Sequence, residues 1–292
     1  MIFDIIVPTY NRYDALPAFF EKLNGLDKTL YTLWLIDDCS TKKDAAVIPD
    51  WDNLKYIQLT ENIGQAGARN FAIHNGTAPY IISLDDDAWF ADALIDLNTI
   101  AKAFDKYPDT GCLMFNIATP KTTYKADTDG KLLAVHVTCG CAYRRVALQE
   151  IDGFNSLIQG QGEESDISLK LYKANWSIRS LYSVHVFHDF NPDLRSTDWY
   201  LRIRHKETRN SLVVAFIHYP LWSLFWALPG KAITQLLFAI KLKIVVFNTL
   251  KTSVSAIFEF IKMIPKLSKL RSPLSPKQFH KWRSLYKHSN LI

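Results

Sequence analysis

Three adjacent aspartates, Asp85, Asp86 and Asp87, follow the apolar segment from residue 80 to residue 84. Neighbouring carboxylates repel one another, so the triplet needs a compensating cation or full exposure to water. Carboxylate oxygens are hard ligands that suit Mg²⁺ or Mn²⁺, and such an ion could bridge these residues to a diphosphate. A solvated acidic loop would explain the same residues equally well. The triplet is therefore a candidate metal site that needs support from elsewhere in the chain.

A second acidic cluster, Gly162-Glu163-Glu164-Ser165-Asp166, lies about eighty residues later. It opens a predicted helix, and acidic side chains stabilise a helix N-terminus without any catalytic role. A carboxylate at this position could also be a general base that removes a proton from a substrate hydroxyl. We predict Glu164 as this base, with Asp166 as the second candidate.

Arg69 and two histidines are further candidates for binding a substrate or a metal. Arg69 is predicted on a helix after Gly64 and Gly67, where an arginine near the aspartates could bind a diphosphate. A surface arginine without a ligand is the commoner case. His185 and His188 alternate with apolar residues in SVHVFHDF, and we expect both on the same side of one strand. A single histidine is usually structural, but His188 near the strand's end is a candidate metal ligand.

Short apolar segments alternate with helical patterns through about residue 205, which predicts a doubly wound, mostly parallel α/β sheet flanked by helices. In such a sheet ligands bind outside the carboxyl ends of the strands, near the point where strand order reverses. The polar sequences PTYNR, DDCS and DDDA follow three predicted strands, so we expect them to line one site. Strands are predicted at residues 2–7, 32–36, 54–59, 80–84, 113–118, 134–138 and 183–187, and helices at residues 13–26, 65–74, 146–151 and 166–174.

The composition supports one substantial core or two modest ones, because 48% of the 292 residues are apolar. Cys39, Cys112, Cys139 and Cys141 are too few for a disulfide scaffold and lack zinc-site spacing, so we expect them reduced and mostly buried. The first residues, MIFDIIVPTYNR, lack the basic and apolar regions of a secretory signal. We therefore expect a cytoplasmic protein.

The chain changes character after about residue 205. No Asp, Glu, Lys or Arg occurs from residue 210 to residue 230. This stretch could just cross a hydrocarbon layer of about 30 Å, but His218, Pro220 and Pro229 interrupt it. We therefore favour a helical hairpin at the membrane interface, with a spanning helix as the alternative.

The C-terminal region is basic and predicts an amphipathic helix. Residues 241–292 hold eleven Lys or Arg against a single acid, Glu259. A helix packed on the protein's own core would show the same periodicity, but the positive charge favours docking on anionic lipid. The tail lacks the aromatic and basic interleaving of a nucleic-acid platform, so we expect no nucleic-acid partner. The apolar positions of the predicted helix are Ile233, Ile240, Ile244, Phe247, Leu250, Val254, Ile257, Ile261 and Ile264.

Taken together, these features resemble glycosyltransferase family 2, whose members are inverting enzymes with the GT-A fold. The resemblance covers about residues 3–205 and implies a catalytic domain at residues 1–205 that binds a nucleotide sugar. Residues 206–292 would then form a helical region that associates with the membrane. Six segments in the family's order carry the resemblance: IIVPTYNR, LIDDCS, ENIGQAGARN, ISLDDDA, GCAYRRVALQEIDGFN and GEESDISLKL.

The resemblance implies roles for individual residues. Glu164 stands where the family usually has an aspartate as base, a change of one methylene that keeps the carboxylate. Arg144 and Arg145 fall on the acceptor side, where one of them would meet an anionic acceptor. At the metal, Mn²⁺ or Mg²⁺, Asp85 and Asp87 match the family's DxD pair, with Asp87 as the direct ligand, and His188 would complete the shell. At the nucleotide, Pro8, Thr9 and Tyr10 would border the base, Asp38 would accept its imide N–H, Arg69 would face the base and the diphosphate, and Asp86 would lie near the ribose.

The implied reaction is transfer of a hexose from a UDP- or dTDP-linked sugar to a hydroxyl of a glycan or glycolipid. A membrane acceptor, with the enzyme peripheral at the inner face of the plasma membrane, follows from the basic tail and from the resemblance. A nicotinamide-dependent oxidoreductase would need GxGxxG after the first strand, and a sugar nucleotidyltransferase a Gly-rich basic loop, where this chain has PTYNR. The alternative that stays open is a catalytically silent, nucleotide-binding membrane adaptor with the same fold.

Overall fold

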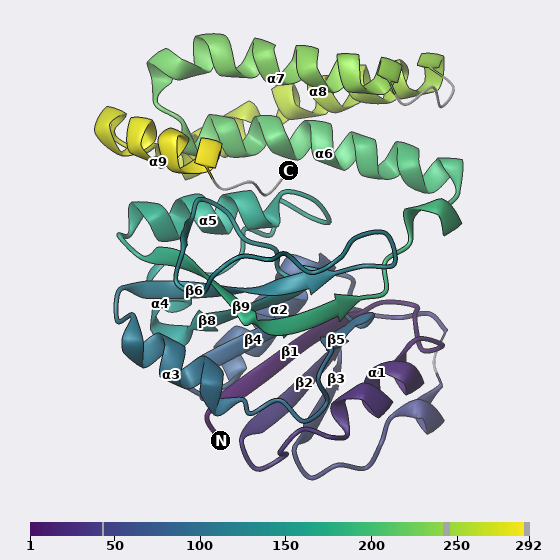
Figure 1. Ribbon diagram of the computed structural model, residues 1–292. Helices are drawn as coiled ribbons and strands as arrows, with labels where there is room; N and C mark the ends of the chain where they lie inside the picture. The colour runs from purple at the N-terminus through teal and green to yellow at the C-terminus, as the bar shows by residue number, and fades with distance from the viewer. Residues whose placement is uncertain (43, 242–245, 289–292) are drawn as a thin grey trace.

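The computed structural model describes residues 1–42, 44–241 and 246–288. One sheet lies at the centre, and the C-terminal helices form a separate layer beyond it (Figure 1). The strand order is β3-β2-β1-β4-β8-β6-β9-β5, and β7 also pairs with β9. The strands are β1 (Phe3–Thr9), β2 (Tyr31–Asp37), β3 (Leu54–Gln58), β4 (Tyr80–Leu84), β5 (Ala88–Phe90), β6 (Thr110–Ala118), β7 (Leu132–Leu133), β8 (Gly140–Arg144) and β9 (Ser177–His188).

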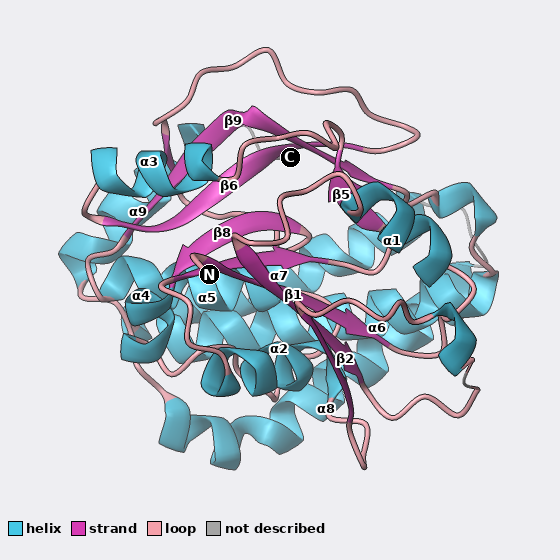
Figure 2. Ribbon diagram, turned by 90° about the horizontal axis from the view of Figure 1, so that it is seen from below, coloured by secondary structure: helices cyan, strands magenta, loops and turns pink. Residues whose placement is uncertain are grey.

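Helices cover both faces of the sheet, as predicted for an α/β fold (Figure 2). The apolar side chains of α1 and α3 enter one core, and those of α2, α4 and α5 enter the other. The helices are α1 (Leu16–Leu23), α2 (Gly64–Asn75), α3 (Asn98–Lys106), α4 (Arg145–Glu150), α5 (Glu163–Lys173), α6 (Thr197–His218), α7 (Leu221–Lys241), α8 (Val246–Leu270) and α9 (Pro276–His288).

The first strand shows why this sequence builds a two-sided sheet. All seven residues of β1 are buried. Phe3, Ile5 and Val7 pack in the core beside α1, whereas Ile6 packs in the core beside α2. Because side chains alternate along a strand, a continuous apolar run supplies both cores at once.

Strand order reverses around β1, which places a ligand site there. β2 and β3 lie on one side of β1, and β4 lies on the other, with all of these strands parallel. The loops after β1 and β4 therefore meet at a switch point, as the polar sequences predict. Parallel pairs occur among β1 to β4 and between β6 and β9. Between them, β8 runs antiparallel to both β4 and β6.

Several elements differ from the sequence-based expectation. The strand predicted at residues 134–138 is wrong, because that segment has no strand pairing. The predictions missed β5, β7, β8 and α3. The sequence of β8, Gly-Cys-Ala-Tyr-Arg, has little strand propensity of its own, and its place between β4 and β6 makes it a strand.

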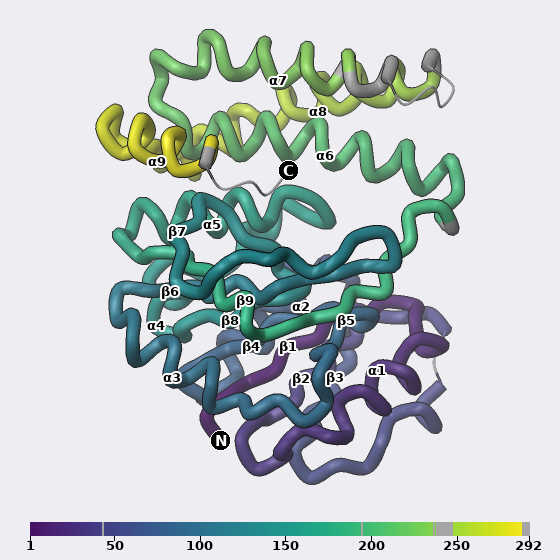
Figure 3. The backbone as a smooth tube through the Cα atoms, viewed as in Figure 1, coloured from purple at the N-terminus to yellow at the C-terminus, as the bar shows by residue number. Residues whose placement is uncertain are grey.

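The C-terminal helices share a core with the α/β part of the chain. The predicted boundary at residue 205 falls inside α6, which packs against α5, α7 and α8. A turn at Tyr219 and Pro220 separates α6 from α7, as expected for a hairpin, and the trace in Figure 3 shows the fold-back. Among the described residues, no helix combines the length and the hydrophobicity needed to cross a membrane. The single helix predicted for residues 233–264 corresponds to parts of α7 and α8, and Ile244 lies outside the described residues.

Candidate functional site

Asp86 and Asp87, which follow β4, contact side chains from the end of β1 and from the loop after it. Thr9 Oγ1 donates a hydrogen bond of 2.7 Å to Asp86. The guanidinium of Arg12 lies 3.4 Å from Asp86 Oδ1 and 2.8 Å from Asp87 Oδ2. Burial raises the pKa of Asp86 to about 7, because the charge of Arg12 and the hydrogen bond from Thr9 compensate only partly. The cation that the triplet requires is thus supplied in part by Arg12, which the sequence analysis did not single out.

Arg69, on α2, contacts the first aspartate of the triplet. Its side chain is 1% exposed, donates to Ser83 Oγ at 3.1 Å and pairs with Asp85 Oδ1 at 2.5 Å. Burial alone would lower the pKa of Arg69, but the charges of Asp85, Glu163 and Glu164 act together with Tyr143 and raise the pKa. Arg69 therefore stays cationic and holds Asp85, rather than presenting its charge to solvent.

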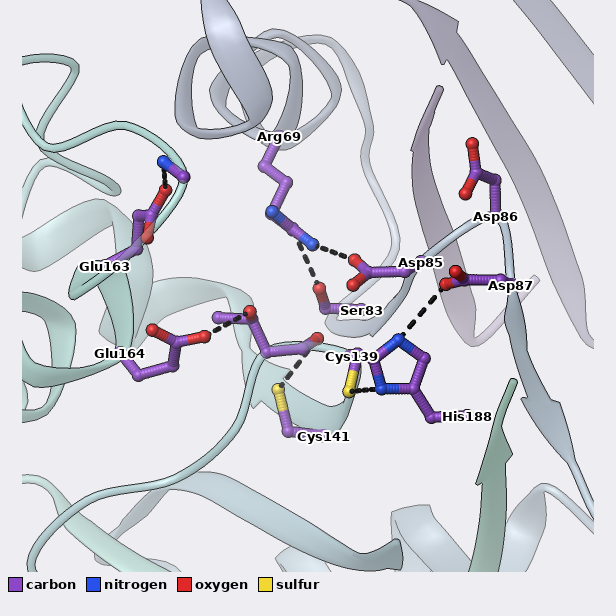
Figure 4. A network of polar contacts seen from close by, with 12 residues as sticks. Arg69, Ser83, Asp85, Asp86, Asp87, Cys139, Cys141, Glu163, Glu164 and His188 are labelled. Atoms are coloured by element: carbon purple, nitrogen blue, oxygen red, sulfur yellow. Dashed lines mark hydrogen bonds and ion pairs between the residues drawn. The ribbon is translucent and has the colours of Figure 1, made fainter. Parts of the chain in front are cut away.

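His188, the last residue of β9, lies directly beside Asp87 (Figure 4). Its Nε2 atom is 3.2 Å from Asp87 Oδ1, and its Nδ1 atom is 3.5 Å from the sulfur of Cys139. Burial by itself would raise the pKa of Asp87, but the hydrogen bond with His188 and the charge of Arg12 lower it to about 2. Asp87 is therefore an ionised carboxylate next to an imidazole.

These groups fit a hard divalent cation. One ligand atom each from Asp85, Cys139 and His188 lies within 4.8 Å of the others, and Asp87 adjoins His188. Burial raises the pKa of the Cys139 thiol well above its ordinary value, so the thiol stays protonated and is a poor ligand. The remaining donors are two carboxylates and an imidazole, a set that suits Mn²⁺ or Mg²⁺.

A second group of possible metal ligands is part of the core. Cys112 of β6, Cys141 of β8 and His136 are buried close together. Both ring nitrogens of His136 already have partners, Ser168 Oγ at 2.9 Å and the hydroxyl of Tyr143 at 2.5 Å. Burial lowers the pKa of His136 to about 3, so the ring is neutral. His136 is therefore a core histidine with both ring nitrogens hydrogen-bonded, and the cluster needs no metal to explain it.

The acidic cluster at the start of α5 faces the aspartates (Figure 4). Glu164 is half-buried and accepts a hydrogen bond of 3.0 Å from Thr138 Oγ1. Glu163 is 5% exposed, and its carboxylate accepts the backbone N–H of Gly160. Burial, followed by the charge of Glu164, raises the pKa of Glu163 to about 7. Of this cluster, Glu164 is thus the carboxylate that lies at the site, and its hydrogen-bond partner, the hydroxyl of Thr138, is uncharged.

Asp166 has a different environment from Glu164. It is 1% exposed and accepts a 2.7 Å hydrogen bond from His218 Nε2 at the end of α6. A cavity of about 730 Å³ between α5 and α8 is lined by Asp166, His218 and Lys170, and by none of Asp85, Asp87 or Glu164. Asp166 joins α5 to the C-terminal helices through His218 and is therefore unsuited to a role as base.

The residues expected at the nucleotide line the ends of β1 and β2. Pro8 and Thr9 are buried, and Tyr10 is 46% exposed. Asp38 is buried, and its two oxygens accept the backbone N–H groups of Ile63 at 2.8 Å and Gly64 at 2.9 Å. Gly64 has a φ of 76°, which favours glycine. Asp38 therefore fixes the start of α2, the helix that carries Arg69.

Asp37 is a buried polar centre that the sequence analysis did not separate from Asp38. It is 0% exposed, and its carboxylate accepts hydrogen bonds from Tyr13 at 2.8 Å, Ser40 N at 2.9 Å and Gln58 at 3.0 Å. These bonds fix the loops after β1 and β2. Within the motif, only Ser40, three residues after Asp37, is a local signal for this network, because Tyr13 and Gln58 are distant in the chain.

The expectation that His185 and His188 share a side of the strand is wrong. His185 is exposed and its ring lies 4.5 Å from that of Tyr124, whereas His188 faces Asp87. Residues three apart in a strand face opposite sides, because the period is two.

Neither Arg144 nor Arg145 is free to meet an acceptor. Arg145 is buried, pairs with Asp4 and donates to the carbonyl oxygen of Ala78 at 2.5 Å. Arg144 donates to the carbonyl oxygen of Phe104 at 3.0 Å. Both arginines stabilise the sheet and its flanking helices, which corrects the acceptor role expected for one of them.

The chain resembles several known proteins. The family model "Glycosyl transferase family 2" matches residues 4–152. The chain is 32% identical over 93 residues to the poly(ribitol-phosphate) beta-N-acetylglucosaminyltransferase TarS of Staphylococcus aureus, an alignment that covers 30% of this chain and 16% of that protein. Only a small part of that relative's length is thus represented.

Two solved structures share the fold. The structure of S. aureus TarS 1–349 in complex with UDP-GlcNAc superposes with a TM-score of 0.60 at 18% identity, covering 98% of this chain and 88% of that one. The mannosyltransferase PcManGT from Pyrobaculum calidifontis, in complex with GDP-Man and Mn²⁺, superposes with a TM-score of 0.60 at 15% identity, covering 98% and 84%. At these identities the likeness is one of fold.

Proposed function

The chain belongs to glycosyltransferase family 2, and we propose that it is an inverting, metal-dependent hexosyltransferase. Its donor is a UDP- or dTDP-linked sugar, and its acceptor is a hydroxyl of a glycan or glycolipid presented at the inner face of the plasma membrane. The observation that carries the proposal is the meeting of Asp87 and His188, 3.2 Å apart, opposite Glu164. A carboxylate beside an imidazole, with a further carboxylate from another element, supports the proposal of a metal site and a base.

The chain's own residues account for the steps of an in-line displacement. Glu164 accepts the proton of the acceptor hydroxyl, and the oxygen attacks the anomeric carbon opposite the leaving diphosphate, which inverts its configuration. Asp85, Asp87 and His188 would hold Mn²⁺ or Mg²⁺, which when bound supplies positive charge for the departing diphosphate. Arg69 acts through Asp85, because its burial keeps it from the diphosphate in this conformation.

The nucleoside lies over the ends of β1 and β2 in this proposal. Pro8, Thr9 and the exposed Tyr10 border the base, and Asp86 receives the ribose. The carboxylate of Asp38 accepts two backbone hydrogen bonds and has further lone pairs. One of these lone pairs accepts the imide N–H of the base.

Thermal unfolding with a panel of nucleotide sugars tests the proposal. A ligand that binds only the folded chain raises the unfolding midpoint. We expect one UDP- or dTDP-linked hexose to raise it in the presence of Mn²⁺, and Asp87→Asn to abolish the Mn²⁺-dependent part. Asp52→Asn, at an exposed aspartate away from the site, is the control and should behave as the wild type. A well-folded protein that responds to no donor contradicts the proposal.

The second candidate function is a catalytically silent, nucleotide-binding membrane adaptor, and one structural observation favours it. Asp85, Asp86 and Asp87 all have cationic partners in the folded chain, so their presence alone does not require turnover. Glu164 discriminates the two functions, because its partner is the neutral Thr138. An enzyme loses sugar transfer in Glu164→Gln and keeps donor binding, whereas an adaptor keeps its biological role.

A further inference from the structure

The side of α7 that faces away from the sheet carries large apolar side chains in solvent. Trp222, Phe225 and Trp226 are 49%, 72% and 73% exposed, and Ile233 and Leu237 are 56% and 60% exposed. These residues recur at helical spacing on one side of α7. Such a cluster of exposed aromatic and aliphatic groups is unusual on a free surface.

The neighbouring helix α8 extends this apolar surface. Ala256 and Phe260 are buried on the side of α8 that packs against α6. Val254, Phe258 and Ile261 lie on the opposite side and are 43%, 61% and 50% exposed. The helix therefore packs on the protein with one face and leaves a second apolar face uncovered. We call the exposed residues of both helices the outer face: Trp222, Phe225, Trp226, Ile233, Leu237, Val254, Phe258 and Ile261.

The outer face occupies the layer of the molecule farthest from most of the sheet. α7 and α8 lie side by side beyond α6 in Figures 1 and 3. α6 begins at Thr197, nine residues after His188, so one helix leads from the proposed metal site to this layer. A surface bound through the outer face would thus be connected to the catalytic part by a packed helix.

Positive charge borders the outer face. Lys251, Lys262, Lys266 and Lys269 are exposed along α8. Glu259, the single acid of residues 241–292, is engaged by Arg209 at 2.7 Å and lies near His205 at 3.4 Å. The helix α7 contains no acid. A surface that combines exposed apolar side chains with positive charge complements a partner that has an anionic surface and an apolar interior.

We propose that the outer face seats in the headgroup region of an anionic lipid bilayer and holds the catalytic part at the membrane. Aromatic side chains, tryptophan above all, favour the membrane interface, and lysines beside them attract anionic headgroups. A second copy is a poorer occupant, because a twofold contact through this face would bring the lysine rows of two protomers together. The inference rests on the proposed function for its purpose, since it brings the enzyme to a membrane-presented acceptor.

Vesicle cosedimentation of the full chain tests this surface without any nucleotide sugar. We expect binding to phosphatidylcholine vesicles that contain phosphatidylglycerol, weak binding to phosphatidylcholine alone, and a decrease with salt. Phe225→Ser with Trp226→Ser should weaken binding at least about tenfold, and Lys251→Gln with Lys262→Gln should weaken it about fivefold per lysine. Because these side chains are exposed, the variants should keep the wild-type unfolding midpoint.

Matched controls come from exposed residues on the other side of the molecule. Leu94→Ser, at a residue 81% exposed, and Lys22→Gln with Lys102→Gln should bind vesicles as the wild type does. Three results overturn the inference: no binding to anionic vesicles, equal losses in the controls, or a solution dimer that dissociates in the Phe225 and Trp226 variant. Donor binding is measured separately by thermal unfolding, so failure of the membrane surface and failure of the transferase proposal are distinguishable.

Discussion

Arg12 Nη2 lies 2.8 Å from one oxygen of Asp87, while His188 Nε2 lies 3.2 Å from the other. The carboxylate proposed as the direct metal ligand is thus flanked on one side by a protein cation and on the other by an imidazole. A divalent cation that binds Asp87 must tolerate or displace the guanidinium of Arg12. Arg12 is partly exposed, so it can move without unfolding the sheet.

Arg12→Ala should therefore strengthen binding of Mn²⁺ in the absence of donor. Removing a like charge next to the ion lowers the Coulomb repulsion, and partial exposure limits the gain to about three- to tenfold in Kd. Electron paramagnetic resonance of free and bound Mn²⁺ measures this change. Arg12→Lys keeps the charge and should stay close to wild type. Weaker binding in Arg12→Ala would show that Arg12 supports the metal site instead.

Glu164→Gln should lower kcat by about 10² to 10⁴, because the amide cannot accept the acceptor's proton. The amide oxygen can still accept the hydrogen bond from Thr138, so the local structure should survive. Sugar transfer is measured by release of the nucleoside diphosphate, and donor binding by the shift in unfolding midpoint. Glu21→Gln, at an exposed position of α1, is the control. Full transfer activity in Glu164→Gln would assign the base elsewhere.

Asp166→Ala should act on stability. His218 would lose its partner in a buried place between α5 and α6, at a cost of about 2–4 kcal/mol in the free energy of unfolding. Urea denaturation measures the loss, and donor binding of the folded fraction should persist. An Asp166→Ala protein with wild-type stability and no transfer would return Asp166 to the list of possible bases.

Glu163→Gln should change how stability depends on pH. The pKa of Glu163 is raised in the folded chain from 4.5 to about 7, first by burial and then by the charge of Glu164. A raised pKa means that folding favours the protonated form, so its contribution is complete below about pH 4.5 and is lost as the pH rises through about 7. The neutral amide has no such loss.

Between about pH 5 and about pH 8, wild type should thus lose up to roughly 3 kcal/mol of unfolding free energy relative to Glu163→Gln. Urea denaturation of both proteins across this range provides the measurement. The exposed Glu21→Gln variant should follow the wild type. Parallel pH profiles for wild type and Glu163→Gln would mean that Glu163 is ionised in the folded chain despite its burial.

Local pattern in the sequence determined the strands that carry the site. The apolar runs of β1 and β4 end in polar residues, and the order of such runs with helices predicts a switch point at which PTYNR and DDDA meet. Periodicity and charge likewise predicted a basic, helical C-terminal region, but as a single helix where the structure has parts of α7 and α8. These features can be predicted from short segments, because the hydrophobic periodicity of a strand or helix involves only residues close in sequence.

Only the tertiary structure decided how the polar residues pair. Arg12 and Asp87 lie in two segments that are predicted to meet, but the sequence pattern does not say which side chains of these segments pair. Nor does it indicate the contact between Asp166 and His218, which makes a candidate base into a structural residue. The exposed face of α8 is a third case, because α6 buries Ala256 and Phe260 and leaves Val254, Phe258 and Ile261 uncovered. The sequence shows which faces of a helix or strand are apolar or charged. Which segment packs against each face depends on the packing of segments that are distant in the chain.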